Sequence, residues 1–365
     1  YNVNLNTTSV RRANSVAFDV REQGRKVKDA NGVETHQPGW CKSVKAIGWF
    51  IEEYGVAQVS MNLTDEAQTP IHTAFDACVK SAYERGMRVT GSELVGLIPL
   101  QSMLNAGKYF LAKQKRSAGV SEAELVRIAI KSLGLDELAP FNPSERIIEY
   151  VIKGKQQNLL VEKSLTSFAD ETASESPAPG GGSISAYVGA LGVSLGTMVA
   201  NLSSHKKGWD ERWEFFSNWA ERGQEIKEKL LKAVDEDTHA FNEIMNAFSL
   251  PKSTDAEKAA RTEAIQAATK NAIQVPYHVM QLANESFGVL KAMAEEGNPN
   301  SVSDAGVGAL CARTAVYGAY LNVKINSASL KDELYKNEVL ANAEKILKQA
   351  LESESEILKV VKAKL

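Results

Sequence analysis

The stretch Glu221–Phe248, ERGQEIKEKLLKAVDEDTHAFNEIMNAF, organises the rest of the chain. Seven of its residues follow one another at intervals of three or four, which places their side chains on one face of an α-helix. These residues are Ile226, Leu230, Ala233, Asp237, Phe241, Ile244 and Phe248. Six are apolar and one is a carboxylate, so the pattern predicts a long helix with a single acid in its buried face.

Asp237 is the unusual member of this face, because an acid among apolar neighbours loses its hydration. Such a carboxylate has to be hydrogen-bonded, paired or turned toward a cavity, and burial tends to raise its pKa. A carboxyl group tuned in this way can exchange protons near neutral pH. The alternative is structural: the aspartate bonds the N-terminus of a neighbouring helix. Asp235 and Glu236 leave the apolar face and are expected in water.

The composition excludes several classes of protein. A length of 365 residues favours two or more domains, and a net charge of −3 argues against a nucleic-acid partner. The three cysteines are far apart and the five histidines form no metal-binding pattern, so we predict no metal and a reducing, cytoplasmic location. The sequence shows no signal peptide and no uninterrupted apolar run of about 18 residues, so no membrane span is expected.

The pattern of the chain changes near its middle. Residues 1–152 alternate strand-like and helical segments in the order strand, helix, strand, strand, helix, strand, which predicts a ferredoxin-like split βαβ subdomain with further helices behind it. Residues 153–164 are polar and indicate a linker. Residues 165–365 keep helical spacing nearly throughout and predict a bundle of long helices. The fold class is therefore multidomain, α/β followed by all-α.

The segment Ser176–Ser183, SPAPGGGS, is the most unusual local sequence. Glycines allow tight turns, and a helix predicted from Ser183 onward leaves unpaired N–H groups at its start. Gly180, Gly181, Gly182 and Ser183 are therefore candidates for binding an anion or a carbonyl group of a substrate. The alternative is a plain turn between two helices. No Lys-Ser or Lys-Thr pair follows the glycines, so this is not a nucleotide-binding P-loop.

A second polar segment precedes a helix near residue 304. Ser303 and Asp304 are candidate substrate-binding residues there, and the alternative is that one of them caps the helix. Asn322 and Asn326 follow one turn apart on the same helix. Their amides could read the donor and acceptor edge of a heterocycle, although surface amides are common.

Nine segments, in this order, resemble formiminotransferase-cyclodeaminase, the bifunctional folate enzyme of histidine degradation. They are YNVNLN (1–6), VREQGR (20–25), IGWFIEEYGVAQVSMNL (47–63), GSELVGLIPL (91–100), LGLDELAPFNPSERIIEY (133–150), APGGGS (178–183), AVDEDTHAF (233–241), LPKSTDAEKAAR (250–261) and AYLNVKIN (319–326). The resemblance covers nearly the whole chain.

The resemblance implies a function for the helical half. The proposed catalytic aspartate of the family matches Asp237, and the glycine segment together with Ser303 and Asp304 would hold the folate. The implied reaction closes 5-formiminotetrahydrofolate to 5,10-methenyltetrahydrofolate and releases ammonia. The implied substrate is a tetrahydrofolate derivative, which we expect to be polyglutamylated, and no metal is implied.

The resemblance implies less for the first half. Asn2, Asn4, Asp19 and Glu93 would contribute to one wall of a folate cleft. The family's transferase half normally begins with another α/β subdomain, which carries the catalytic histidine, and no segment here matches it. His72 belongs to a helix of the second subdomain and does not replace that histidine. We therefore expect a truncated form that lacks the N-terminal transferase subdomain and glutamate formiminotransferase activity.

Two other functions stay open. The same helical fold supports methenyltetrahydrofolate cyclohydrolase, and the expected truncation would also suit a non-catalytic folate-binding or assembly module. Whatever the function, we expect a homo-oligomer, at least a dimer through the helical domain. The glycine-rich helix 184–201 and a heptad-like stripe from Val339 to Val360 are the reasons for this expectation.

Overall fold

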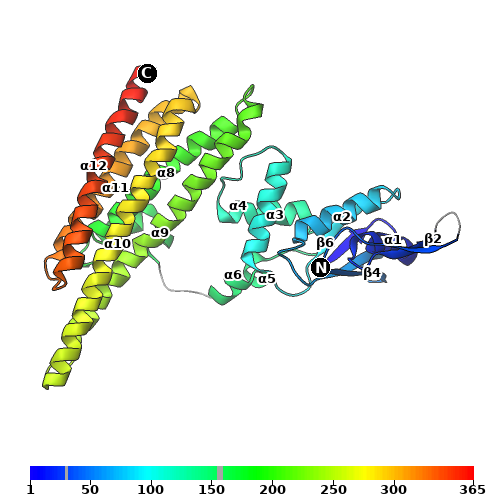
Figure 1. Cartoon of the computed structure of the whole chain (residues 1–365), viewed down its shortest axis with the longest axis horizontal. Coiled ribbons are helices and arrows are strands. Elements are labelled where there is room, and N and C mark those ends of the chain that lie inside the picture. Colours follow the sequence, from blue (N-terminus) through cyan, green and yellow to red (C-terminus); the bar gives the residue numbers. More distant parts are fainter. Residues whose placement is uncertain (29–31, 154–158) are drawn as a thin grey trace. The chain divides into compact units, whose positions relative to one another are not determined.

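The computed structural model describes residues 1–28, 32–153 and 159–365, and Figure 1 shows its helices and strands. By their contacts the residues form two compact units, which are described separately. Unit 1 comprises Tyr1–Gln114 and Ser121–Lys155, and unit 2 comprises Lys115–Val120 and Gln156–Leu365. Residues 154–158 of the predicted linker lie outside the described residues. The predicted domain boundaries stay a prediction.

Unit 1 is built on a four-stranded antiparallel sheet with the strand order β4-β5-β1-β6. The strands are β1 (Asn2–Leu5), β4 (Val44–Ile51), β5 (Val56–Leu63) and β6 (Val89–Glu93). Helix α1 (Val10–Val20) follows β1, and helix α2 (Ile71–Tyr83) follows β5. Apart from a hairpin described below, the elements therefore follow one another in the predicted order.

The two faces of this sheet differ, because side chains alternate along each strand. Val3 and Leu5 are fully buried in the core that the sheet forms with α1 and α2. Asn2 and Asn4 alternate with them, so the opposite face of β1 is polar. The other helices of the unit are α3 (Leu100–Lys113), α4 (Glu122–Leu133), α5 (Pro143–Arg146) and α6 (Ile148–Lys153).

A second, two-stranded sheet lies where the sequence predicts a polar loop. It pairs β2 (Arg25–Lys28) with β3 (Glu34–Gln37) in antiparallel register. The prediction missed this hairpin because β3 is exposed along its length and β2 is only half-buried at alternate residues. Strands of this kind carry no apolar alternation by which they could be recognised.

Long helices form unit 2 and run side by side as a bundle (Figure 1). The helices are α7 (Leu165–Thr172), α8 (Gly181–Ser204), α9 (Trp213–Ser249), α10 (Asp255–Glu296), α11 (Val302–Ser327) and α12 (Glu333–Lys364). Three short 3₁₀ turns are η1 (Leu160–Glu162), η2 (Asp210–Arg212) and η3 (Pro299–Ser301).

Helix α9 contains the apolar stripe from which the sequence predicts a helix. Ile226, Leu230 and Ala233 are fully buried in the bundle core. Phe248, at the other end of the stripe, is half exposed. The difference follows from the length of the helices: the end of α9 and the start of α10 continue beyond the rest of the bundle (Figure 1). Asp237 lies between the buried and the exposed part of the stripe.

Helix α8 is long and apolar enough to cross a membrane by length and composition alone. Within the chain it packs against α9, α10 and α11 and is largely buried. Its glycines allow this packing. A Cβ atom on Gly192 would come within 2.9 Å of the carbonyl oxygen of Gly308 in α11, and one on Gly308 would come within 2.8 Å of that of Gly192. The backbones of α8 and α11 therefore approach each other closely within one chain.

The apolar stripe near the C-terminus also packs within the chain. Val339, Ala343, Ala350 and Ile357 of α12 are buried in the core of the bundle. Helix α12 contacts α10 and α11. The glycines of α8 and the apolar stripe of α12 are therefore both used in packing within the chain.

Candidate active site

The glycine segment forms the start of helix α8, with Gly180 as the residue that precedes its first turn. No side chain caps this end from within the segment. The first N–H groups of a helix have no acceptor inside the helix, so those of Gly181, Gly182 and Ser183 need partners elsewhere. The N–H of Ser183 donates to Oδ2 of Asp237 at 2.8 Å, and the Ser183 hydroxyl lies 3.0 Å from the same oxygen.

Asp237 reaches this helix start from α9 and is partly buried. Burial raises the pKa of its carboxyl group, and the two hydrogen bonds from Ser183 lower it in part, with a net rise. The structural alternative drawn from the sequence is therefore realised, because Asp237 bonds the N-terminus of a neighbouring helix. The same environment also moves the carboxyl group toward proton exchange near neutral pH. A catalytic role for Asp237 stays a prediction.

Asp235 is not in water, contrary to the prediction. Its side chain is partly buried, and its Oδ1 accepts a hydrogen bond from the N–H of Leu160 at 2.7 Å. The reason is that η1 packs on this side of α9, a contact that the helical periodicity does not reveal. Glu236 is also partly buried and forms an ion pair with Lys232 at 3.0 Å.

The close approach of Asp237 to the start of α8 requires a glycine at position 182. A Cβ atom at this position would lie 2.1 Å from Oδ1 of Asp237 and 2.5 Å from its Cγ. Gly180 differs, because a Cβ atom there would meet only the carbonyl oxygen of Pro177 at 3.9 Å. Of these two glycines, Gly182 is therefore the one whose missing side chain lets the carboxylate reach the helix start.

A cavity of about 150 Å³ opens beside this contact. Its lining includes the three glycines, Asp237, Phe241 and Ile244, together with Asn322 and Asn326 from α11. Pockets for drug-sized ligands measure about 300–1,000 Å³, so this cavity has room for only one part of such a ligand. It combines free backbone donors, one acid and an apolar wall, a mixture suited to a polar heterocycle.

The two amides of the cavity are fixed by the backbone. Nδ2 of Asn322 donates to the carbonyl oxygen of Gly318 at 2.9 Å, and Nδ2 of Asn326 donates to that of Ala272 at 2.7 Å. Each amide therefore keeps its oxygen as an acceptor for a ligand. The sequence shows both residues as neighbours on one helix, but only the fold brings them to Asp237.

Ser303 and Asp304 are not brought to this cavity. They lie in the first turn of α11, with Ser303 exposed and Asp304 partly buried. From Asp304 to Asn322 the helix rises through about 18 residues, or about 27 Å. Neither side chain caps the helix. A substrate-binding role for these two residues stays a prediction.

In the residues that the structure describes, no group of three or more His, Cys, Asp or Glu side chains could hold a metal ion. The predicted absence of a metal stays a prediction.

Three of the four residues predicted for the first half lie together on the polar face of the unit 1 sheet. Nδ2 of Asn2 donates to Oε2 of Glu93 at 3.2 Å. Nε2 of Gln58 is 2.8 Å from Oδ1 of Asn4 and 3.3 Å from Oε2 of Glu93. Asn4 and Gln58 are fully buried, and Nδ2 of Asn4 has no partner among the described residues.

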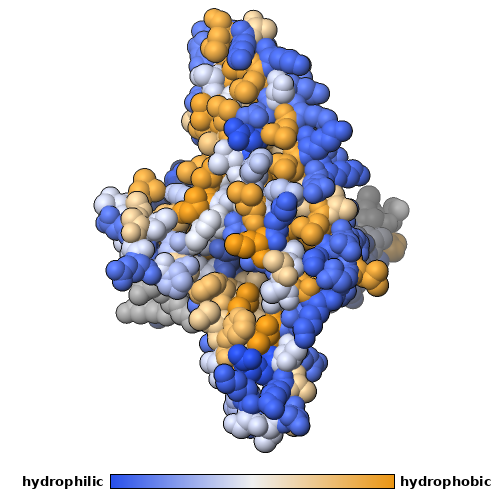
Figure 2. All heavy atoms as spheres, turned by 90° about the vertical axis from the view of Figure 1, so that its left-hand side faces the viewer, coloured by the Kyte–Doolittle hydropathy of each residue, from blue (hydrophilic) through white to orange (hydrophobic). Residues whose placement is uncertain are grey.

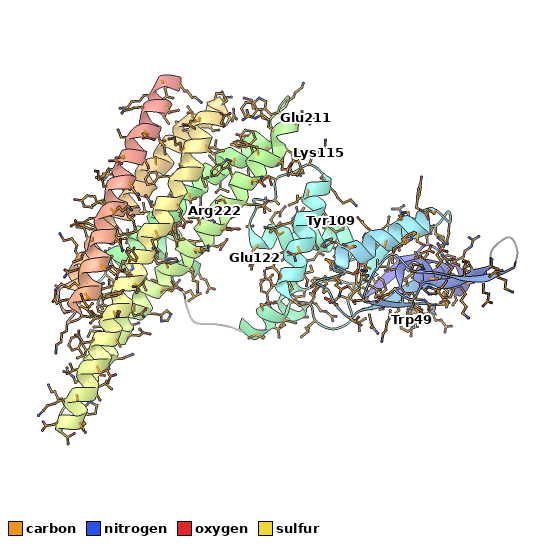
Figure 3. The ribbon with its side chains drawn as sticks, in the orientation of Figure 1. Trp49, Tyr109, Lys115, Glu122, Glu211 and Arg222 are labelled. Carbon is orange, nitrogen blue, oxygen red and sulfur yellow. The ribbon has the colours of Figure 1, made fainter. Side chains whose placement is uncertain are left out.

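Sequence reasoning missed the aromatic and amide side chains of this face. Nε1 of Trp49, labelled in Figure 3, donates to Oε1 of Gln58 at 3.1 Å, and the Tyr54 hydroxyl donates to Oε1 of Glu93 at 3.1 Å. Strand register could have found Gln58, because it stands opposite both Asn4 and Trp49. The alternation of apolar residues along the strands does not by itself fix that register.

Asp19, the fourth residue, lies elsewhere. It is buried on α1, where Arg85 pairs with its Oδ2 at 2.6 Å and Ser81 donates to the same oxygen at 2.7 Å. Arg25 pairs with its other oxygen. Helix α1 packs on the core face of the sheet, so Asp19 stabilises an ion-pair network and does not join Asn2, Asn4 and Glu93.

Comparison with known proteins decides the family. The sequence profile of formiminotransferase-cyclodeaminase matches residues 164–345, and that of the formiminotransferase domain matches residues 1–153. A methenyltetrahydrofolate cyclohydrolase from Methylorubrum extorquens is 37% identical over 55% of this chain and 97% of its own length. The chain belongs to the formiminotransferase-cyclodeaminase family. The formimidoyltransferase-cyclodeaminase from Gallus gallus is 37% identical over 98% of this chain.

The fold of the helical unit is also known. The crystal structure of a formiminotetrahydrofolate cyclodeaminase from Thermotoga maritima matches with a TM-score of 0.50 and 29% identity, over 55% of this chain and 97% of that one.

The comparisons correct one expectation about the first half. The formiminotransferase domain is present in residues 1–153, so the expectation that the N-terminal transferase part is lacking is wrong. This chain spans 64% of the length of the Gallus gallus relative.

Proposed function

We propose that the helical unit is a formimidoyltetrahydrofolate cyclodeaminase, which converts 5-formiminotetrahydrofolate to 5,10-methenyltetrahydrofolate and ammonia. The observation that carries the proposal is the position of Asp237. Its carboxyl group has a raised pKa and lines a small cavity beside an open helix start. Membership of a family with this activity supports the same conclusion.

The reaction needs one group that moves protons. N10 of the folate attacks the formimino carbon and loses its proton, and the former imine nitrogen leaves as ammonia after gaining two protons. One of these protons is the one lost by N10, and the other comes from solvent. Asp237 can take up the first and deliver it to the leaving nitrogen. The cavity is large enough for this reacting part of the substrate alone.

A cyclohydrolase is the second candidate function, because a relative of that name is 37% identical over 97% of its own length. Assays of the purified chain with 5-formiminotetrahydrofolate and with 5,10-methenyltetrahydrofolate separate the two. A cyclodeaminase releases ammonia from the first substrate. A cyclohydrolase consumes the second without ammonia, and a non-catalytic folate-binding module turns over neither.

The amide of Asn322 is expected to contribute to substrate binding. Asn322→Ala removes an acceptor from the cavity, while the side-chain bond that is lost goes to the residue's own helix. We expect the KM for 5-formiminotetrahydrofolate to rise by about fivefold, since a hydrogen bond contributes about 1 kcal/mol, with a smaller change in kcat. Steady-state kinetics measures both.

Asn271→Ala is the matched control for this variant. Its amide is exposed and donates to Glu243 at 2.7 Å, away from the cavity lining. An Asn322→Ala chain with the KM of the Asn271→Ala chain would show that this amide does not contact the substrate.

We propose further that the polar face of unit 1 contacts a folate. The formiminotransferase domain supplies the context, and the side chains fit the chemistry. Glu93 is partly exposed and offers acceptor oxygens for a pterin edge, while Asn2 and Asn4 are buried and support this face from within the sheet. Trp49 is 41% exposed, which leaves an aromatic surface for stacking. Asp19 is left out of this proposal because its carboxylate is already paired.

We propose a homo-oligomer, at least a dimer, on a different basis from the sequence patterns. Figure 2 shows patches of apolar side chains on the outer surface of unit 2. Large apolar side chains remain exposed along α8 and α11, and such patches often mark protein interfaces. They are Leu191, Met198, Leu202, Val307, Leu310, Tyr317, Leu321 and Ile325. Light scattering at micromolar concentration should give at least twice the chain mass, and a monomeric mass would contradict the proposal.

A further inference from the structure

The side chain of Ser183 is completely buried, and its hydrogen-bond contacts go to α9. Its hydroxyl lies 2.9 Å from the carbonyl oxygen of Val234 and 3.0 Å from Oδ2 of Asp237. Its backbone N–H donates to the same Oδ2 at 2.8 Å. Both donors of this residue are therefore engaged within the protein, which leaves neither for the folate.

We propose that Ser183 is the positioning residue of Asp237: its two donors hold Oδ2, so that Asp237 exchanges its proton with the substrate through Oδ1. This inference rests on the proposed cyclodeaminase function and assigns Ser183 a role other than substrate binding.

The two oxygens of the carboxyl group differ in their surroundings. Oδ2 accepts both bonds from Ser183, and an oxygen that already accepts two hydrogen bonds is a poor site for a proton. Oδ1 has no hydrogen bond within the described part of the chain. It faces the backbone of Gly182, where a Cβ atom would collide with it, and Asp237 and Gly182 both line the cavity. Oδ1 is therefore the oxygen that a small substrate group can reach.

The hydroxyl of Ser183 also suits a carboxyl group that changes its charge. It has one proton and two acceptors within reach, Oδ2 and the Val234 carbonyl oxygen. It donates to Oδ2 when Asp237 is ionised and can rotate toward Val234 when Asp237 is protonated. Rotation of a single hydroxyl group then accompanies the proton transfer, and the helix start keeps its place.

Ser183→Ala tests the proposal because it removes the hydroxyl donor and keeps the backbone donor. The hydroxyl bond favours the ionised carboxyl group, so its loss should move the titration of Asp237 to higher pH by about one pH unit. Carbon-13 NMR of aspartate-labelled full-length chain measures this titration, with Asp237→Asn to assign the signal. The corresponding limb of the kcat profile should shift in the same direction.

Two further variants make the test specific. Ser183→Thr keeps a hydroxyl group and should restore the titration. Ser194→Ala removes a hydroxyl group from the same helix that bonds only its own backbone, at Ala190, and should leave the titration unchanged. If Ser183→Ala does not fold, Ser183→Cys fills a similar space with a weaker donor and should shift the titration in the same direction.

An Asp237 signal that titrates at the wild-type pH in Ser183→Ala, or in Ser183→Cys where that variant replaces it, overturns the proposal, even if the variant is less stable. The NMR titration needs no substrate. A wild-type chain without ammonia release would therefore refute the proposed function separately, while the titration still decides the role of Ser183.

Discussion

Asp237→Asn is expected to lower the turnover of 5-formiminotetrahydrofolate by about 10²–10⁴-fold, the range typical of losing a general acid or base. The amide keeps an oxygen that can accept the two bonds from Ser183, so the start of α8 should stay in place. It cannot carry the exchangeable proton. Steady-state turnover together with equilibrium binding of the folate checks both parts, and binding should persist.

The raised pKa of Asp237 also predicts how the stability of the wild-type chain and of this variant depends on pH. The pKa of Asp237 is raised in the folded chain, so the stability that this group contributes is full below its unfolded pKa. That contribution is lost as the pH rises through the folded pKa. The wild-type free energy of unfolding should therefore fall over that window, and Asp237→Asn should lack this fall. Denaturant unfolding at several pH values measures the difference.

Glu236→Gln is the control for the charge change. Its carboxylate forms only a partly exposed ion pair with Lys232, and such pairs contribute about 0–1 kcal/mol. Asp235 is a poorer control, because its removal would leave the N–H of Leu160 without its acceptor. If Asp237→Asn turns over the substrate at nearly the wild-type rate, Asp237 has only the structural role that its contact with α8 already shows.

Gly182→Ala should abolish most of the activity without removing any polar group. A Cβ atom 2.1 Å from Oδ1 cannot be accommodated, so the carboxyl group or the helix start has to move. Alanine would ordinarily favour a helix over glycine by about 1 kcal/mol. Overpacking costs about 1–3 kcal/mol and acts in the opposite direction. We expect a folded, somewhat less stable chain whose turnover falls by about 10²-fold or more, because small displacements of catalytic groups have effects of this size.

Gly180→Ala makes the same chemical change two residues earlier. Its φ of −109° suits any residue, and the nearest atom to the new Cβ is 3.9 Å away. This variant should keep nearly wild-type turnover and stability. Equal activity of the two alanine variants would mean that the close approach of Asp237 to α8 is not needed for the reaction.

Much of the fold can be predicted from the sequence because apolar side chains mark it. The stripe of α9 predicts a helix and the alternation along β4 predicts a strand, since each buries one face. The hairpin β2–β3 is not found, because exposed strands carry no such mark. The stripe of α12 shows a different limit of sequence-based prediction. Its spacing predicts that these residues are buried, but it does not show which helix covers them.

The candidate site, like the fold, can be predicted only in part from the sequence. The sequence isolates Asp237 and the glycine segment as separate signals, each from local chemistry. Their contact depends on how α8 packs against α9, which one sequence does not reveal. For the same reason the sequence predicts Asp304 in the site from its position at a helix start, although it lies far along α11 from Asn322.

The most direct test of the account is the release of ammonia when the purified chain acts on 5-formiminotetrahydrofolate. The wild-type chain should produce ammonia and 5,10-methenyltetrahydrofolate together and in equal amounts, and Asp237→Asn should produce very little of either. A wild-type chain that binds the folate but releases no ammonia, or that only hydrolyses the methenyl compound, would contradict the proposed cyclodeaminase function.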